Sequence, residues 1–194
     1  MMKPTPLLLL VPLAWASFGF AQQAPPPTSS AQVWRQSQKT DAARAMTFTR
    51  YTLAGKFLTP PQSDPANRPA LTLDCIPATE SHSSKGRFLA GSLLVGSPLK
   101  IIYVEPEEIH GTSYYPKVTV RYRIDGAREE EEKWSAGTEK TSASISKDVL
   151  ERILHARSVA ITADDDRGSQ VSMQFDMPDP RPVEEACNVD YRKE

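Results

Sequence analysis

One run, residues 117–125, limits what this chain of 194 residues can fold into more than any other stretch. Apolar side chains occupy every second position of the run, and polar or charged side chains occupy the positions between them. Because successive side chains of a β-strand point to opposite faces, this period predicts a strand with one buried and one solvated face. Asp125-Gly126 follows at once, and this dipeptide favours a tight hairpin turn.

Other segments have the β-branched, aromatic or alternating character of strands. They are residues 46–53, 70–76, 86–95, 99–104, 158–162 and 171–177, with a returning strand around Trp134. Strands that follow one another closely, without intervening helices, favour antiparallel pairing. The sequence therefore predicts a mainly β protein, an antiparallel β-sandwich or barrel of about seven strands with one packed α-helix and one disulfide.

The helix is expected over residues 146–157. Ser146 has the side chain of an N-cap, Asp148 lies in the first turn, and Arg157 is expected in the last turn, where each charge suits the helix dipole. Four residues form an apolar stripe at helical spacing, namely Val149, Leu150, Ile153 and Leu154. We expect this stripe to lie across an open end of the sheet.

The N-terminus has the features of an export signal. Lys3 supplies a positive charge, residues 7–16 form an apolar run, and small residues precede the expected cleavage after Ala21 or Ala16. A membrane anchor is the alternative, but the run is shorter than the roughly 20 residues needed to span a bilayer, and Pro12 interrupts it. We therefore expect a periplasmic or secreted protein without an integral membrane segment after cleavage.

The rest of the chain divides into two parts by composition. Residues 22–40 are rich in proline and serine, which predicts an extended tether, although Trp34 within it could dock on the domain. Residues 41–194 are expected to form a single β-rich domain.

The chain has two cysteines, Cys75 and Cys187. In an exported chain two cysteines predict one disulfide, and Cys75 falls on the apolar face of a predicted strand. Metal ligation or a nucleophilic thiol would need histidine or further cysteine nearby, and only His82 lies close in the sequence. We therefore expect a Cys75–Cys187 bridge.

Motifs for nucleophilic or metal chemistry are weak. The S-x-x-K pattern occurs at residues 97–100 and 144–147, but the companion motifs of penicillin-binding enzymes are missing. The histidines, His82, His110 and His155, have no metal-ligand spacing. No metal, no cofactor and no catalytic residue are expected.

Two acidic runs have alternative interpretations. Residues 164–166 are three aspartates that could bind calcium, but a hairpin tip is the simpler interpretation because the calcium loop pattern is absent. Residues 129–132 are four glutamates, and these favour a solvated loop tip over a cation site. Paired carboxylates for glycoside hydrolysis need only lie close in space, so the sequence leaves them open.

A binding surface is the other candidate. Arg121, Arg123 and Asp125 lie on the solvated face of the predicted strand, where charges also serve solubility. Tyr114 and Tyr115, which precede that strand, could form a contact surface or pack over the edge of the core. Nucleic acid is not expected, because the formal net charge is -1 and no basic stripe is present.

Several landmarks stand in a familiar order. They are a Leu-x-Leu-x-Cys strand ending at Cys75, Tyr-Arg-Ile-Asp at residues 122–125, the downstream Trp134, Ser-Val-Ala-Ile at 158–161, Val-x-Met-x-Phe at 171–175 and the late Cys187. This order resembles the VasI/TagO-like periplasmic proteins found beside type VI secretion genes, over about residues 46–187. The glutamate-rich insertion and the proline-rich tether depart from that pattern. The resemblance implies an exported β-sandwich with an accessory, non-catalytic role.

Three functions follow as hypotheses. The first is an exported, non-catalytic binding or accessory domain of the cell envelope, with an envelope protein as partner and a possible association with type VI secretion. The second is a periplasmic inhibitor of a cell-wall hydrolase that presents a rigid loop, residues 105–116 or 129–132. The third is a small cell-wall hydrolase, which would need convergent carboxylates or a Ser–His contact.

Overall fold

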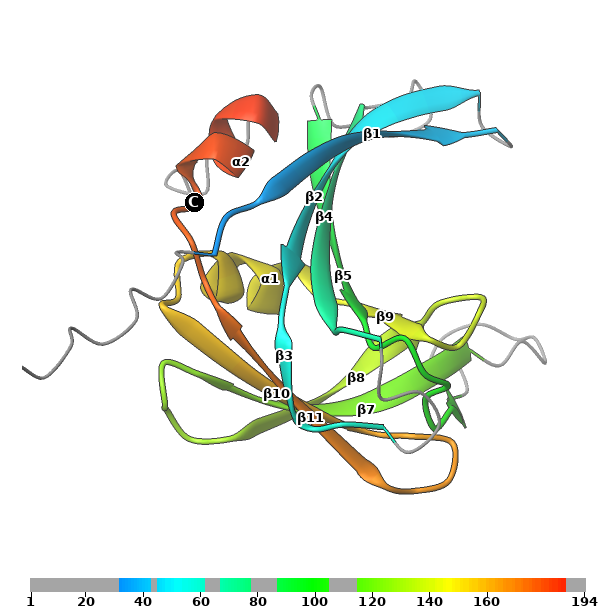
Figure 1. Cartoon of the computed structure of the whole chain (residues 1–194). Coiled ribbons are helices and arrows are strands. Elements are labelled where there is room, and N and C mark those ends of the chain that lie inside the picture. Colours follow the sequence, from blue (N-terminus) through cyan, green and yellow to red (C-terminus); the bar gives the residue numbers. More distant parts are fainter. Residues whose placement is uncertain (1–31, 43–44, 62–66, 78–86, 105–114, 188–194) are drawn as a thin grey trace, which may run out of the picture. The chain divides into compact units, whose positions relative to one another are not determined.

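The computed structural model describes residues 32–42, 45–61, 67–77, 87–104 and 115–187. Within these ranges the chain forms one eleven-stranded antiparallel sheet, curled into a half-barrel, and two helices (Figure 1). The elements in chain order are β1 (Arg35–Asp41), β2 (Met46–Ala54), β3 (Lys56–Thr59), β4 (Ala70–Pro77), β5 (Arg87–Leu94), β6 (Ile102–Val104), β7 (Tyr115–Ile124), β8 (Glu130–Ala136), β9 (Ser142–Ser144), α1 (Lys147–Leu154), β10 (Ser158–Asp164), β11 (Gln170–Asp176) and α2 (Arg181–Cys187).

The order of strands explains how the sheet curls. The path runs β1-β2-β4-β5-β9-β8-β7-β10-β11-β3, and β6 pairs with β7 outside this path. β2 and β3 are consecutive in the chain, with Gly55 as the single residue between them, yet they lie toward opposite ends of the path. One bent segment of chain therefore joins both ends of the sheet.

Gly55 is required at this bend because the aromatic ring of Phe175 packs directly over it. A Cβ placed on Gly55 would lie 2.4 Å from Cε1 of Phe175, which is far inside van der Waals contact. Phe175 is fully buried, so its ring has little freedom to move aside. Glycine thus allows the bent segment and β11 to approach closely.

The core lies on the inner side of the curled sheet. β7 contributes Val118, Val120 and Tyr122, and the apolar stripe of α1 predicted from the sequence belongs to the same buried cluster. Burial of such side chains is the main favourable term in folding, at roughly 25 cal/mol per Å² of apolar surface. The inner faces of β4, β10 and β11 complete the cluster with Leu71, Leu73, Cys75, Val159, Ile161, Ala163, Val171, Met173 and Phe175.

The strand and turn predicted at residues 117–125 are confirmed. β7 alternates between buried and exposed side chains, and it is paired on both sides, with β8 and with β10. Asp125 and Gly126 have φ angles of 51° and 73°, the positive values that a type I′ turn requires at its two central residues. The N–H of Ala127 donates to the carbonyl of Ile124 at 2.9 Å and closes the turn.

The mainly β architecture is confirmed, but the count of about seven strands is wrong. β3 and β9 have four and three residues, too few to show a period of two. β1 was expected to belong to the tether over residues 22–40; instead it pairs along its whole length with β2. Its side chains are almost all exposed, so no alternation revealed it. Residues 22–31 lie outside the described ranges, and Trp34 packs against the core as expected.

The helix prediction needs two corrections. α1 ends at Leu154 rather than at residue 157, and the N–H of Arg157 donates to Asp125 Oδ1 at 2.8 Å, so Arg157 belongs to the connection into β10. The basic residue in the last turn is Arg152. Ser146 makes no capping bond with its side chain; its hydroxyl donates to Glu132 Oε2 at 2.9 Å instead.

The disulfide prediction is confirmed. Cys75 on β4 is bonded to Cys187 at the end of α2, with their Cα atoms 5.3 Å apart. The sequence did not reveal α2, because Pro180 just before it and Pro182 in its first turn are not typical of a helix interior. Proline is tolerated in the first turn of a helix, where the N–H has no helical partner. Within the described ranges no helix has the length and apolar character that crossing a bilayer requires.

The close approach at the bend gives a testable prediction. Gly55→Ala should lower the free energy of unfolding by about 1–3 kcal/mol, because the new methyl group meets the buried Phe175 ring. Urea denaturation measures this loss. Phe175→Leu replaces the ring with a smaller side chain, so the double variant should lose less stability than the sum of the two single variants. Strict additivity would contradict the packing described here.

Candidate functional site

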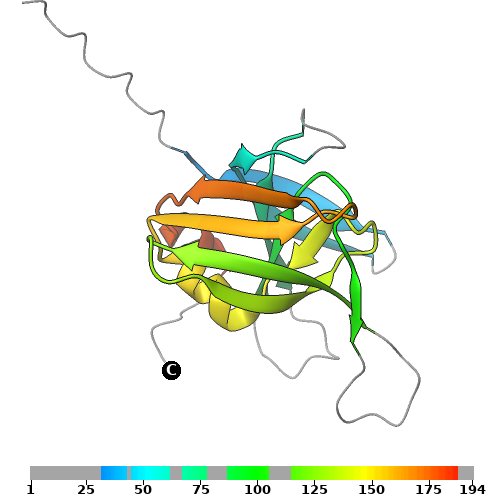
Figure 2. The ribbon, with the colours of Figure 1, turned by 90° about the horizontal axis from the view of Figure 1, so that it is seen from below.

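The outer face of the sheet, as the term is used here, consists of the outward-facing side chains of β8, β7, β10 and β11. Figure 2 looks onto β7, β10 and β11, which lie side by side without a helix across them. Residues that are directly opposite one another on neighbouring strands share a face. A single row across the four strands is therefore Glu131, Arg121, Thr162 and Ser172.

Arg121 is at the centre of this face. Its Nη2 donates to Asp164 Oδ1 at 2.8 Å, and the Arg121 side chain is 25% exposed. Its Nε is buried and has no hydrogen-bond partner among the described residues. An unpartnered buried donor is costly, and most buried polar groups in proteins have a partner.

A second arginine shows what a complete pairing looks like. Arg50 on β2 is 29% exposed, close to the value for Arg121. Its Nε and Nη2 both donate to the carboxylate of Asp74, each at 2.6 Å, and this hydrogen bonding raises the pKa of Arg50 above its ordinary value. Arg121 uses only Nη2 for its carboxylate, so its pairing is incomplete and its Nε has no acceptor among the described residues.

Two depressions flank Arg121. The first has a volume of about 280 Å³, and its lining comprises Lys100, Ile102, Thr119, Arg121, Glu131, Asp164 and Gln170. The second has a volume of about 210 Å³ and lies around Arg121, Arg123, Glu129, Thr162 and Ser172, with Leu58 at its side. Arg121 belongs to both, so a ligand in either depression would contact it.

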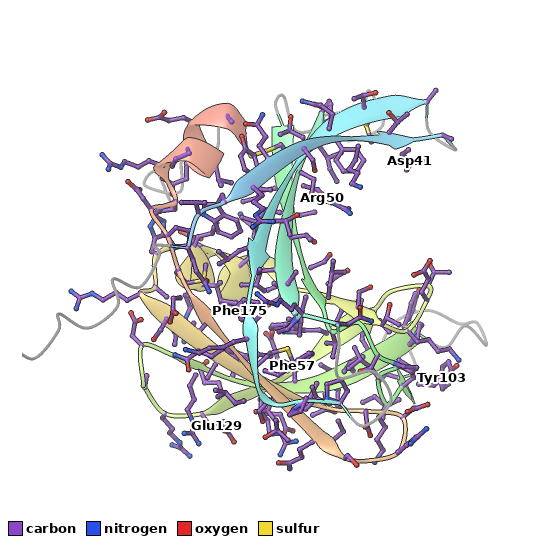
Figure 3. All side chains as sticks on the ribbon, in the orientation of Figure 1. Asp41, Arg50, Phe57, Tyr103, Glu129 and Phe175 are labelled. Carbon is purple, nitrogen blue, oxygen red and sulfur yellow. A yellow bond between two sulfur atoms is a disulfide. The ribbon has the colours of Figure 1, made fainter. Side chains whose placement is uncertain are left out.

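The remaining sequence-predicted binding residues have different roles. Arg123 forms an ion pair with Glu129 at 3.1 Å, and both side chains are largely exposed, so the pair contributes little to stability. Asp125 has a structural role, because its Oδ1 accepts the backbone N–H groups of Arg157 and Ser158, each at 2.8 Å. Figure 3 shows Glu129 on the side of the strands away from Phe175.

The tyrosines lie at the far end of β7. Tyr115 is 48% exposed and pairs with Val104 of β6, while Tyr103 is also exposed (Figure 3). Tyr114 lies outside the described residues. Tyr115 is therefore not packed over the core, and it shares the outer face with Lys117 and Thr119 because these residues alternate along one strand.

The glutamate run is a strand, not a loop tip. Glu130, Glu131 and Glu132 belong to β8 and are paired with β7, so Glu130 and Glu132 share the inner face with Trp134. Glu132 Oε2 accepts the indole N–H of Trp134 at 2.6 Å and the hydroxyl of Ser146 at 2.9 Å. Glu130 and Glu132 lie four and two residues before Trp134, and this period of two could have revealed that they share its face of a strand.

Glu130 anchors α1 to the sheet. Arg152 of α1 donates to both of its carboxylate oxygens, and the hydroxyl of Tyr122 donates to Oε2 at 3.2 Å. The Arg152 hydrogen bonds lower the pKa of Glu130, and burial raises the pKa of Tyr122. A general acid needs a raised pKa, so Glu130 has the opposite electrostatics from a catalytic proton donor.

The other motifs also have structural explanations. Ser97 of the first S-x-x-K pattern is fully buried, and Ser144 of the second ends β9. The aspartates at residues 164–166 do not converge, because Asp164 pairs with Arg121 while Asp165 Oδ1 accepts the N–H groups of Arg167 and Ser169 in the hairpin turn. Among the described residues no group of three or more His, Cys, Asp or Glu side chains could hold a metal ion.

The histidines provide no catalytic pair in the described part of the chain. His155 Nε2 lies 3.2 Å from Glu184 Oε1 and so joins the end of α1 to α2. His82 and His110 lie outside the described residues. The same is true of most of the loop at residues 105–116, one of the two loops proposed for an inhibitory role.

Comparisons with known proteins add no relative. No family model, no curated protein and no solved structure matches this chain. The candidate site therefore depends on its geometry alone.

The Glu130–Arg152 pairing gives a prediction about acid. Because the folded-state pKa of Glu130 is lowered from its ordinary value of 4.5, its charged form stabilises the fold above that value, and the contribution is lost as the pH falls through the lowered pKa. Wild-type protein should therefore be more stable than Glu130→Gln at neutral pH, and the difference should shrink in acid.

Urea denaturation between neutral pH and about pH 3 measures this difference. Glu131→Gln is the matched control, since Glu131 is the exposed neighbour on the outer face. A difference between wild type and Glu130→Gln that stays constant over the whole range would contradict the assignment of the pairing.

Proposed function

We propose that this chain is an exported, non-catalytic binding domain of the bacterial cell envelope and that it recognises its partner through the outer face around Arg121. Three features support the export part of the proposal. The N-terminal sequence has the charge, apolar run and small residues of a signal peptide. The Cys75–Cys187 disulfide suits an oxidising compartment. The resemblance to the VasI/TagO-like proteins suggests an accessory role there, beside a type VI secretion system.

One observation carries the binding part: the Arg121 side chain lines two depressions, and its Nε has no hydrogen-bond partner among the described residues. Arg121 is held in place by Asp164 and by a strand that is paired on both sides. Rigid placement lowers the entropy that binding must overcome, because the donor is already oriented. The outer face is thus built to receive a hydrogen-bond acceptor.

The proposal of a non-catalytic role is supported by the carboxylates that already form hydrogen bonds within the fold. The two glutamates on the inner face hold tryptophan, serine and arginine side chains, and the aspartates of the β10–β11 turn hold Arg121 and backbone N–H groups. These carboxylates are engaged in the fold, so we propose that the domain binds and does not catalyse.

The experiment is capture of envelope proteins on immobilised mature domain, with wild type compared with Arg121→Gln. We expect the variant to lose a captured partner by roughly tenfold or more, since a hydrogen bond to a charged group contributes about 1.5–3 kcal/mol. Arg50→Gln is the matched control: that arginine has similar exposure and an ion pair, but its Nε and Nη2 both donate to Asp74.

The control should keep the captured partner. Thermal unfolding of both variants checks that each remains folded at the temperature of the capture. Equal capture by wild type and Arg121→Gln, or equal loss in the two arginine variants, would contradict the proposed function.

A further inference from the structure

The charges around the first depression indicate which ligand chemistry the outer face takes. Four of its lining residues are charged: Lys100, Arg121, Glu131 and Asp164. Arg121 and Asp164 pair with each other, which leaves Lys100 and Glu131. Neither of these two has an ion pair among the described residues. The depression therefore offers one cation, one anion and the guanidinium of Arg121, whose side chain is 25% exposed.

The cation and the anion are on opposite sides of β7. Glu131 is on β8, directly opposite Arg121 on one side. Lys100 lies on the other side, since its backbone N–H donates to the carbonyl of Asp164 at the end of β10. Two strand spacings separate β8 from β10, roughly 10 Å, so the two side chains enclose a space of short-peptide width. Thr119 and Gln170 add neutral hydrogen-bonding groups to the same depression.

This arrangement disfavours ligands of a single charge and uncharged ligands. A phosphate or other pure anion could bind Arg121 and Lys100, but it would also face the Glu131 carboxylate, and like charges repel. A neutral ligand would cover Lys100 and Glu131 without compensating either charge, and burying an unpaired charge is costly. A ligand with both a carboxylate and an ammonium group satisfies all three groups.

We infer that the first depression binds a short zwitterionic peptide, with its carboxylate on the guanidinium of Arg121 and on Lys100 and its ammonium on Glu131. The volume of about 280 Å³ suits one or two small residues rather than a long chain. This inference rests on the proposed function, since it names the ligand class of the same outer face. It concerns the ligand's charged ends and not the sequence of any larger partner.

The test is a titration followed by NMR, in which the Nε–H signal of Arg121 is observed directly. The probes are the dipeptide Ala-Ala, its N-acetyl form, which lacks the ammonium, and its C-terminal amide, which lacks the carboxylate. We expect Ala-Ala to shift the Arg121 Nε–H signal. The N-acetyl form should bind about tenfold more weakly, and the amide should leave that signal unchanged, since each loses a charge-assisted contact.

Two variants assign the two ends of the ligand. Glu131→Gln should remove the preference for Ala-Ala over N-acetyl-Ala-Ala while it keeps the preference for a free carboxylate. Arg121→Gln should abolish the response of the neighbouring Thr119 amide to Ala-Ala. Arg50→Gln serves as the control with unchanged binding.

The titration and the capture experiment can fail independently, so the inference about the ligand and the proposed function are tested separately. No response to Ala-Ala at tens of millimolar, or an equal response to all three probes, would overturn the inference about the ligand. If capture of an envelope partner still depends on Arg121 in that case, the proposed function stands and only the ligand class is wrong. If Ala-Ala binds as expected but capture is independent of Arg121, the ligand class stands and the proposed function is wrong.

Discussion

The structure depends first on the two-sided character of β7. Its apolar residues lie in the core, and the residues between them form the centre of the outer face. β7 is hydrogen-bonded to β8 on one side and to β10 on the other, so a shift of register by one residue would exchange core and surface on this strand. The same alternation therefore specifies the fold and positions Arg121. A binding residue on a central strand is held more rigidly than one on a loop.

Two connections hold the curled sheet together: the bent segment from β2 to β3 and the disulfide between β4 and α2. The segment β2–Gly55–β3 brings β3 against β11 at one end of the strand order, while β2 pairs with β4 near the other. The disulfide links β4 to α2 and places Val183 and Cys187 in the core. A bridge that closes so long a loop stabilises mainly by restricting the unfolded chain, typically by about 2–4 kcal/mol. Both devices support a curled sheet whose outer face no helix covers in the part of the chain described.

The sequence predicted the elements whose side chains alternate or pair unambiguously. Residues 117–125 showed a full period of two, and two cysteines in a chain with a signal-like start left one pairing. β1 escaped because both of its faces meet solvent, and polar residues on both faces leave no period to detect. Glu130 and Glu132 were misassigned because carboxylates on an inward face are unusual; their partners, Arg152, Ser146 and Trp134, are what make that position acceptable.

The candidate site was predictable only in part. Arg121 and Arg123 could be placed on a solvated face from their own strand. Asp164, Lys100 and Thr162 could not be joined to them, because strand order and register bring these residues together from distant parts of the chain. The structural role of Asp125 was not predicted, because a side chain that accepts two backbone N–H groups has no distinguishing sequence pattern.

Native-state amide hydrogen exchange tests the central claim most directly. If β7 is the strand on which both core and site depend, the amides of Val120 and Tyr122 should exchange only through global unfolding, with the free energy obtained from denaturation. The backbone amides of β1 that point away from β2, at the margin of the sheet, should exchange far faster through local opening. Exchange in β7 as fast as in β1 would contradict this account.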